Sequence, residues 1–448
     1  MTTKIRFFRD DIASPDHFTI TLELVPGPAS RGSGVETVMN LALDAYADGR
    51  ISAVTITDNP GGNPALSPDA LAYRIFRIGL DVIVHFTCRD TNRVGMESRA
   101  LQLDLVGIKN ILALTGDYSG TGFGGQGAPV FDLDSVNLIC MLSMLSDRLE
   151  AAGDPERFMV GCAVSPFKKT EGETFTQYAK MCRKVSAGAG FIVTQLGYDA
   201  RKFQELIQIK AHMGIDTPVL ASLYHLTPNV ARIMASGRVP GVVVTPKLLD
   251  QVLKESQNPA AGRAAAVERT ARLGAVLKGL GYRGIHIGGV HKNFKIIANI
   301  LDRMEQIQSE WESFLPDFDF PQPGGFYYYR KDEKSSLSLE TPKYRKKEVP
   351  ARIGWFYRVN RGFHHFFFNF DAPTAPLFAW IAKFIDRYRF TRALFMWIEN
   401  PVKRLLFECQ SCGDCGLPHV AFLCPESQCP KHTRNGPCGG SREGKCEV

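Results

Sequence analysis

The sequence predicts a (β/α)₈ barrel followed by a smaller helical, cysteine-rich metal-binding domain. Two observations predict the barrel: eight short apolar runs recur along the first 290 residues, and segments with helical periodicity separate them. A third observation sets the second domain apart, because seven of the eleven cysteines crowd into the last 40 residues. We place the barrel at residues 1–320, a linker at 321–350, and the helical segment with its cysteine-rich tail at 351–448.

Each predicted strand is four to eight residues long and mostly apolar on both faces, as buried parallel strands are. The runs are ITLELVP (20–26), AVTITD (53–58), VIVHFTC (82–88), NILALTG (110–116), FMVGCAV (158–164), FIVTQLG (191–197), PVLASLY (218–224) and GIHIGG (284–289). Between them, VETVMNLALDAYADG (35–49), SRALQLDLVG (98–107) and FQELIQIKAHMG (203–214) have helical periodicity and end at Gly. Eight such strand–helix units predict a closed barrel.

The composition excludes several classes of protein. The chain has 448 residues, of which 44% are hydrophobic and 22% charged, and these proportions exclude a fibrous repeat and disorder throughout. The net charge of +7 comes without the basic stretch typical of nucleic-acid binders, so we expect no nucleic-acid partner.

The amino terminus and the apolar stretches decide the expected location. The first 18 residues lack the apolar region of a signal peptide, and no 18-residue stretch is free of charge. Residues 364–380 look apolar, but Asp371 and two prolines interrupt them. We therefore expect a cytoplasmic protein in which 364–380 form a buried or interfacial helical segment without a membrane span.

Polar residues stand at nearly every predicted strand end. Barrel enzymes place their chemistry at the carboxyl ends of the strands, so these residues are candidates for an active site. In chain order they are Glu23, Thr55 with Thr57 and Asp58, His85 with Thr87, Asp117, Ser165, Gln195, Tyr224 with His225, and His286.

A glycine-rich loop follows the fourth strand at residues 116–134. Loops of this length are usually lids or ligand-binding segments. No Lys-Ser/Thr follows the glycines, and the next helix begins late, so the loop matches neither a Walker motif nor a dinucleotide fingerprint. These observations argue against a Rossmann domain.

The order and spacing of five segments resemble the methylenetetrahydrofolate reductase family across roughly residues 15–300. These segments are LELVP around Glu23, AVTITD around Thr55, HFTCRD around His85, LALTGD around Asp117, and KVSAGAGFIVTQ from Lys184 to Gln195. The resemblance implies a flavin, FAD with FMN as the alternative, that passes a hydride to 5,10-methylenetetrahydrofolate. The product would be 5-methyltetrahydrofolate.

The resemblance also implies roles for particular residues. Glu23 would be the general acid that opens the folate ring, Asp117 would lie between pterin and flavin, and Gln195 would contact the pterin. It places the flavin contacts at Thr55, His85, Leu114, Thr115, Gly116, Asp117, Phe131 and Lys184.

Two departures from the family pattern bear on these roles. The family has Arg-Gly-Asp where this chain has Thr115-Gly116-Asp117, which leaves the choice between FAD and FMN open. The loop after the seventh strand lacks the family's folate-binding Gln and Phe, and Lys292 stands in place of an Arg. We expect Tyr224, His225 and Lys292 to contact the substrate instead.

The carboxyl-terminal region has two parts. Residues 351–407 are rich in aromatic side chains, which predicts helices whose aromatic residues form a core. The tail then opens with Cys409-x2-Cys412-x2-Cys415, as bacterial ferredoxin motifs do, which favours a [4Fe-4S] cluster over structural zinc. Zinc remains the alternative. The predicted metal ligands are Cys409, Cys412, Cys415, Cys424, Cys429 and Cys438.

The tail also resembles a domain that accompanies certain bacterial reductases of this family. That resemblance implies an electron donor other than NADH, such as a ferredoxin-like protein, with electrons relayed through the cluster. NAD(P)H stays open as the donor, and the reductase family implies a homo-oligomer. Two alternatives stay open: the same chemistry run backwards as a methyltetrahydrofolate oxidase, or a degenerate barrel that serves as a scaffold.

Overall fold

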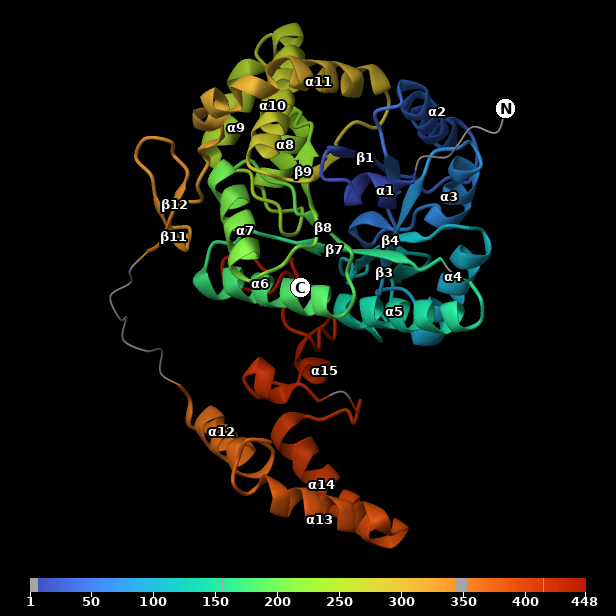
Figure 1. The fold of residues 1–448 in the computed structure, drawn as a ribbon, viewed down its shortest axis with the longest axis vertical. Helices are drawn as coiled ribbons and strands as arrows, with labels where there is room; N and C mark the ends of the chain where they lie inside the picture. The colour runs from blue at the N-terminus through green and yellow to red at the C-terminus, as the bar shows by residue number, and fades with distance from the viewer. Residues whose placement is uncertain (1–6, 155, 344–352, 414) are drawn as a thin grey trace. The chain divides into compact units, whose positions relative to one another are not determined.

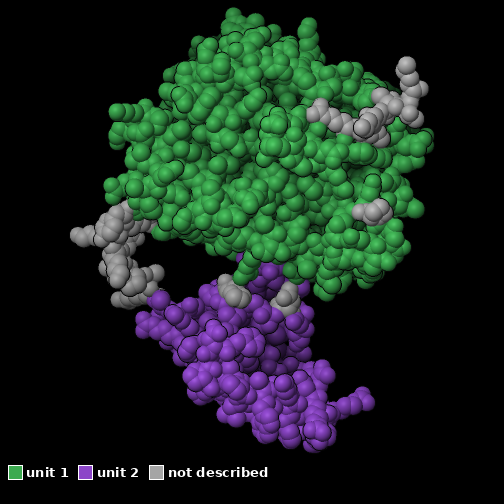
Figure 2. Space-filling model, viewed as in Figure 1, with its two compact units in different colours: residues 1–343, 437–448 green, residues 344–436 purple. Residues whose placement is uncertain are grey.

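A computed structural model describes residues 7–154, 156–343, 353–413 and 415–448. The chain divides into two compact units, which Figure 2 colours green and purple. Unit 1 comprises residues 1–343 together with 437–448, and unit 2 comprises residues 344–436.

Unit 1 is built on a closed barrel of eight parallel strands, which confirms the predicted fold class (Figure 1). Around the barrel the strands follow the order β1-β10-β9-β8-β7-β4-β3-β2, so each strand pairs with its neighbours in the chain. The strands are β1 (Thr19–Leu24), β2 (Ala53–Ile56), β3 (Val82–Thr87), β4 (Asn110–Leu114), β7 (Met159–Val164), β8 (Phe191–Thr194), β9 (Val219–Tyr224) and β10 (Gly284–Gly288). Each lies within one of the predicted runs or extends it by one residue.

Helices cover the outside of the barrel and bury their apolar stripes against it (Figure 1). Helix α2 ends where Gly49 adopts a left-handed conformation with φ of 78°, which glycine adopts without strain. Helix α6 begins with a capping box between Thr170 and Glu173. The covering helices are α2 (Ser33–Asp48), α3 (Pro68–Phe76), α4 (Arg93–Leu105), α5 (Ser135–Ala151), α6 (Glu171–Ser186), α7 (Ala200–His212), α8 (Pro228–Ala235), α9 (Pro246–Glu255), α10 (Pro259–Gly279) and α11 (Phe294–Ile307). Helix α1 (Phe8–Ala13) belongs to a separate cluster, in which Phe8 and Ile12 pack with strand residues such as Phe191.

The stretch predicted as a linker carries structure of its own. After the 3₁₀ segment η2 (Gln308–Phe318), strands β11 (Tyr329–Lys331) and β12 (Ser338–Pro342) form an antiparallel hairpin. Arg201 of α7 binds this hairpin, donating from Nε to Ser338 Oγ at 2.9 Å and from Nη2 to the Tyr329 carbonyl at 2.6 Å. Residues as far as 343 therefore belong to the barrel unit.

The glycine-rich loop contains a two-residue hairpin formed by β5 (Thr121–Gly122) and β6 (Gly125–Gln126). It is tied to the loop after β2, because Gly120 N donates to the Gly62 carbonyl at 2.9 Å. A Cβ on Gly62, whose φ is +77°, would lie 2.1 Å from the Tyr118 carbonyl oxygen. Glycine is thus required at 62 by both conformation and space.

Unit 2 consists of α12 (Trp355–Phe367), α13 (Ala375–Arg387) and α14 (Arg389–Phe407), followed by the 3₁₀ turn η3 (Leu417–Val420) and the short α15 (Pro425–Gln428). The prediction of helices is confirmed, but the prediction that their aromatic residues form a core is wrong. None of α12, α13 or α14 contains a buried residue, because three helices alone enclose too little volume. No helix among the described residues is long and apolar enough to cross a bilayer.

Candidate active site

The predicted strand-end residues meet at one end of the barrel. Parallel register places them side by side, since Glu23 pairs with Thr55 across β1 and β2, and Tyr224 pairs with Gly288 across β9 and β10. The carboxyl ends of eight strands therefore converge on a single mouth lined by polar groups.

Glu23 is the acidic group of this mouth. Burial raises the pKa of its carboxyl to about 7, because withdrawal from water disfavours the charged form. Tyr224 stands close by, and its pKa rises to about 12 through burial and through the negative charge of Glu23. A Cβ on Gly288 would lie 3.0 Å from Glu23 Oε2 and 3.2 Å from Tyr224 Cδ2, so the absence of a side chain there keeps the two groups accessible.

Three histidines at the mouth are neutral near pH 7. Burial lowers the pKa of His85 to about 4 and that of His286 to about 3. Burial and the Arg269 guanidinium lower the pKa of His225 to about 4. Nδ1 of His286 is hydrogen-bonded to Thr21 Oγ1 at 3.0 Å. Neutral imidazoles offer one donor and one acceptor each, which suits them to binding a polar heterocycle.

Several buried polar atoms near the strand ends have no hydrogen-bond partner among the described residues. They are Thr55 Oγ1, Thr57 Oγ1, His85 Nε2, Ser165 Oγ and His225 Nδ1. A buried polar atom without a partner costs about 1–3 kcal/mol, so such atoms gathered at a mouth indicate a ligand with matching donors and acceptors. The edge of an isoalloxazine or pterin ring has this character, and the residues present therefore fit a flavin.

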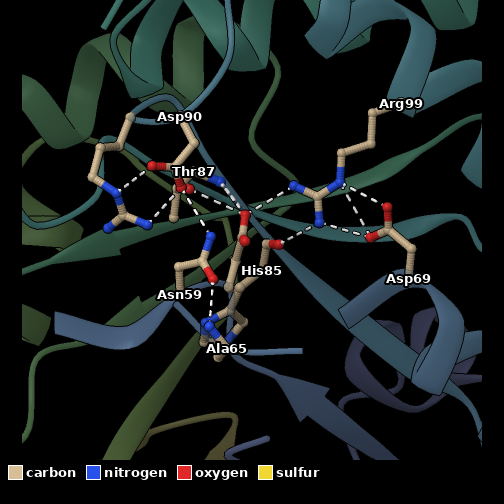
Figure 3. A network of polar contacts seen from close by, with 9 residues as sticks. Asn59, Ala65, Asp69, His85, Thr87, Asp90 and Arg99 are labelled. Carbon is tan, nitrogen blue, oxygen red and sulfur yellow. Dashed lines mark hydrogen bonds and ion pairs between the residues drawn. The ribbon is translucent and has the colours of Figure 1, made fainter. Parts of the chain in front are cut away.

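A network of ion pairs fixes the loops after β2 and β3 (Figure 3). Arg99 Nη1 donates to Asp58 Oδ2 at 2.8 Å, Arg99 Nη2 binds Asp69 Oδ1 at 2.7 Å, and Thr87 donates to the same Asp58 oxygen from both N and Oγ1 at 3.1 Å. Arg99 also reaches the His85 carbonyl at 3.3 Å. The network thereby holds the His85 strand end in place.

Asp117 lies at the mouth and is held by backbone. Its Oδ2 accepts a hydrogen bond from Gly61 N at 3.1 Å, and its carbonyl accepts one from Arg89 Nη1 at 3.4 Å. The Arg89 side chain is only 1% exposed and pairs with Asp90. Thr115 stands where the family has an Arg at the end of β4. The guanidinium of Arg89, from the loop after β3, nevertheless places a cation at this strand end.

The remaining predicted cofactor and substrate residues have varied environments. Leu114 and Gly116 line the end of β4 half-buried, and Thr115 Oγ1 instead contacts Ser135 Oγ at 3.3 Å. Phe131 is fully buried and stacks on Tyr118, with ring centroids 6.4 Å apart. Lys292 is exposed in the turn after β10.

Lys184 and Gln195 are already engaged within the protein. Lys184 Nζ is buried and donates to the Ala163 carbonyl at 2.6 Å, and burial lowers its pKa. Gln195 Nε2 donates to the Pro240 carbonyl at 3.4 Å, and Gln195 Oε1 accepts from Leu196 N at 2.9 Å. For either side chain to contact a ligand, these bonds must be shared or exchanged.

The end of the chain forms a part of this unit that sequence reasoning missed. Residues 437–448 pack on the barrel, where Lys168 Nζ donates to the carbonyls of Gly439 and Ser441 at 2.5 and 2.6 Å. Gln177 Nε2 donates to the Cys438 carbonyl at 3.2 Å. Lys168 could have pointed to this contact, because it follows an apolar strand closely and a lysine that becomes buried there needs hydrogen-bond acceptors.

Arg89 and Arg99 were also missed. Both follow β3, and each of them has an adjacent or facing carboxylate that only the folded chain identifies. The HFTCRD run contained Arg89, but nothing in the sequence showed that its side chain would be buried beside the Asp117 carbonyl.

The described residues do not form a metal centre. In the described ranges, no group of three or more His, Cys, Asp or Glu side chains is arranged to hold a metal ion. Cys429 Sγ lies 3.3 Å from Thr433 Oγ1, and Cys438 Sγ lies 3.4 Å from Glu447 Oε1. The ligand set therefore stays a prediction from the spacing of the cysteines.

The fold is a closed (β/α)₈ barrel with an acidic group and neutral imidazoles at the carboxyl ends of its strands. This is where enzymes with this fold have their active sites, so the class of protein is a (β/α)₈ barrel of the enzyme type. The family model for methylenetetrahydrofolate reductase matches residues 8–305, which is more than half of the chain. The chain belongs to the methylenetetrahydrofolate reductase family. A second model, described as the methylene-tetrahydrofolate reductase C terminal, matches residues 388–448.

Curated relatives agree with this assignment. A probable methylenetetrahydrofolate reductase (NADPH) of Caenorhabditis elegans is 25% identical over 190 residues, covering 40% of this chain and 27% of the relative. Methylenetetrahydrofolate reductase 1 of Schizosaccharomyces pombe is 26% identical over 221 residues, 48% of this chain and 34% of the relative. The match thus spans about a third or less of the length of these relatives.

The comparison with solved structures gives matches at low sequence identity. An uncharacterized protein from Clostridium thermocellum that binds two copies of 5-methyl-5,6,7,8-tetrahydrofolic acid superposes with a TM-score of 0.46 at 10% identity. The superposition covers 68% of this chain and 100% of that one.

Proposed function

We propose that this protein is a flavin-dependent methylenetetrahydrofolate reductase, an oxidoreductase that converts 5,10-methylenetetrahydrofolate to 5-methyltetrahydrofolate. The observation that carries the proposal is Glu23, a carboxyl with a pKa of about 7 beside Tyr224 at the barrel mouth. Family membership and the unpartnered polar atoms at the strand ends support it.

Glu23 supplies the proton of the reaction. In its acid form it protonates N10 of the folate, the bond between N10 and the bridging carbon breaks, and that carbon becomes an N5 iminium. A flavin, when bound, would supply the hydride that reduces this carbon to a methyl group. One proton and one hydride are thus consumed for each 5-methyltetrahydrofolate formed.

The other residues bind and orient the substrate and the cofactor. Thr55, His85 and Ser165 carry buried polar atoms that a flavin or pterin ring would satisfy. Asp117 and Gln195 are proposed to face the pterin, while Tyr224 and His225 replace the missing folate-binding Gln and Phe. Arg99 positions the His85 strand end without touching either ligand.

The electron source is a finer proposal. The spacing of Cys409, Cys412 and Cys415 supports a [4Fe-4S] cluster, with zinc as the alternative, and a donor such as a ferredoxin-like protein or NAD(P)H. We propose FAD as the flavin, with FMN as the alternative, because the resemblance to the family implies FAD. The same site would run in reverse as an oxidase where the donor potential and metabolite levels favour it. We propose a cytoplasmic location.

The test is an anaerobic preparation examined by visible spectroscopy, iron and zinc analysis, and reduction of methylenetetrahydrofolate with a chemically reduced donor. Bound flavin and turnover support the reductase, and about four irons per chain support the cluster. Flavin with one zinc and no iron would make the tail structural. Absence of flavin after reconstitution would overturn the proposal and favour a scaffold.

A further inference from the structure

The helices of unit 2 expose far more apolar surface than a stable module in water normally does. Sixteen large apolar side chains of α12, α13 and α14 are exposed, among them Trp355 at 75%, Trp380 at 65%, Phe390 at 77% and Trp397 at 74%. Scattered exposed apolar residues are ordinary, but sixteen of them on three neighbouring helices of the chain indicate an interaction surface.

The exposed apolar residues of α12 lie on one face of the helix. Trp355, Val359, Phe363 and Phe366 follow a spacing of three and four residues, which brings them to the same side. Arg361 stands on the opposite side, and Arg358, three residues after Trp355, flanks the apolar face. The helix is therefore amphipathic, with its apolar face uncovered.

Helices α13 and α14 repeat this arrangement and pack against each other. Leu377, Trp380 and Phe384 share a face of α13, and Lys383 and Arg387 flank it, each three residues after one of its aromatic side chains. On α14, Phe390, Leu394 and Trp397 share a face from which Arg392 and Lys403 are excluded. All three helices thus carry Lys or Arg beside or opposite an aromatic face.

The charge of this region is strongly positive. Residues 353–407 contain eight Lys and Arg against three Asp and Glu, although the whole chain carries only +7 on 448 residues. Arg358 and Arg361 are also exposed and lie in a groove with His364 and His365. A surface with this balance attracts an anionic partner.

We propose that α12, α13 and α14 form an interfacial binding surface for an anionic lipid bilayer, lying in the headgroup plane. An aromatic face with Lys and Arg beside or opposite it is the composition of helices that lie in a membrane interface, because long cationic side chains at the edge of the face reach the headgroups. Crossing the bilayer is not required, since no described helix is long and apolar enough for it. Self-association through the same face would instead bring two strongly basic regions together.

Tryptophan fluorescence offers a direct test. Three of the four tryptophans, Trp355, Trp380 and Trp397, lie on the proposed surface, and the fourth, Trp311, lies in η2 against Gly279 of α10. The full chain is titrated with vesicles of phosphatidylglycerol and with vesicles of phosphatidylcholine. We expect a blue shift and co-flotation with the anionic vesicles only, and an unchanged shift in Trp311→Phe.

Two variants separate the apolar and the charged contributions. Trp380→Ser with Trp397→Ser should abolish co-flotation. Lys383→Glu with Arg392→Glu should weaken it about 25-fold or more, because each cation near an anionic surface contributes about a fivefold factor. Far-UV circular dichroism and flavin binding, compared with the unchanged chain, show whether each variant still folds.

Two outcomes would overturn the proposal. One is a full chain that ignores anionic vesicles and already has blue-shifted tryptophans, because the barrel or a second copy then covers the surface; light scattering distinguishes these occupants. The other is equal binding to both lipids, because charge then plays no part. Neither outcome bears on folate reduction, which is assayed separately without vesicles.

Discussion

The two units place similar aromatic residues in opposite environments. In β3, Phe86 is 0% exposed and has the Arg99 guanidinium 4.4 Å from its ring centroid, whereas Phe390 of α14 is 77% exposed. Both sequence segments are apolar, and only the barrel closes on itself to bury them. Apolar residues in a sequence thus predict that a segment will be covered by other apolar groups. The topology of the chain decides whether those groups come from the same chain or from another molecule.

The largest expected effect concerns the barrel mouth. Glu23→Gln removes the transferable proton and keeps the size of the side chain, so turnover of methylenetetrahydrofolate should fall at least about 100-fold, the typical contribution of a general acid. Flavin binding should be unchanged. Steady-state assays and the visible spectrum of the same preparation check both expectations, and retained turnover would contradict the role of Glu23.

A core truncation in the barrel should have the next largest effect. Phe86→Ala leaves a cavity beneath Arg99 and should lower the free energy of unfolding by about 3–5 kcal/mol. Urea denaturation monitored by circular dichroism measures it. Phe86→Leu serves as the control, because it retains most of the apolar volume and should lose clearly less.

The tail of the chain offers a matched pair of lysines. Lys168→Met leaves the carbonyls of Gly439 and Ser441 without their buried donor and should cost about 2 kcal/mol. Lys169→Met breaks only a pair with Glu443 whose side chains are 32% and 57% exposed, so it should cost at most about 0.5 kcal/mol. Limited proteolysis after Arg442 should accelerate in the first variant alone. Equal cleavage in both would show that Lys168 does not hold the tail.

The fold and most of the mouth could be predicted from sequence, because both depend on local patterns. Strand runs identify the eight strands of the barrel, and the barrel rule alone brings Glu23 and Tyr224 to one end. Contacts across long sequence separation could not be predicted, such as Lys168 with the tail 271 residues away. The exposure of α12 to α14 was missed because composition does not report whether enough chain surrounds a helix to cover it.

The pH dependence follows from the raised pKa of Glu23. Its proton-donating form prevails below about pH 7, so turnover should fall about tenfold per pH unit above that value. Between about pH 4.5 and 7 the folded state keeps a proton that the unfolded chain releases, so this group makes stability decrease as pH rises. Unfolding of the unchanged chain and of Glu23→Gln at pH 5 and pH 8 isolates this contribution. A stability difference between the two that does not change with pH would contradict the raised pKa.

The smallest expected effect on stability concerns the exposed aromatic residues of unit 2. Phe390→Ser removes an aromatic ring that is 77% exposed, so the free energy of unfolding of the full chain should change by no more than about 0.5 kcal/mol. Binding to phosphatidylglycerol vesicles should nevertheless weaken, because the ring belongs to the aromatic face of α14. A loss of stability comparable with that of Phe86→Ala would mean that the ring is already covered, either by the rest of the chain or by a second copy. Separating these two effects in one variant is therefore what distinguishes a membrane-facing helix from an ordinary core helix in this protein.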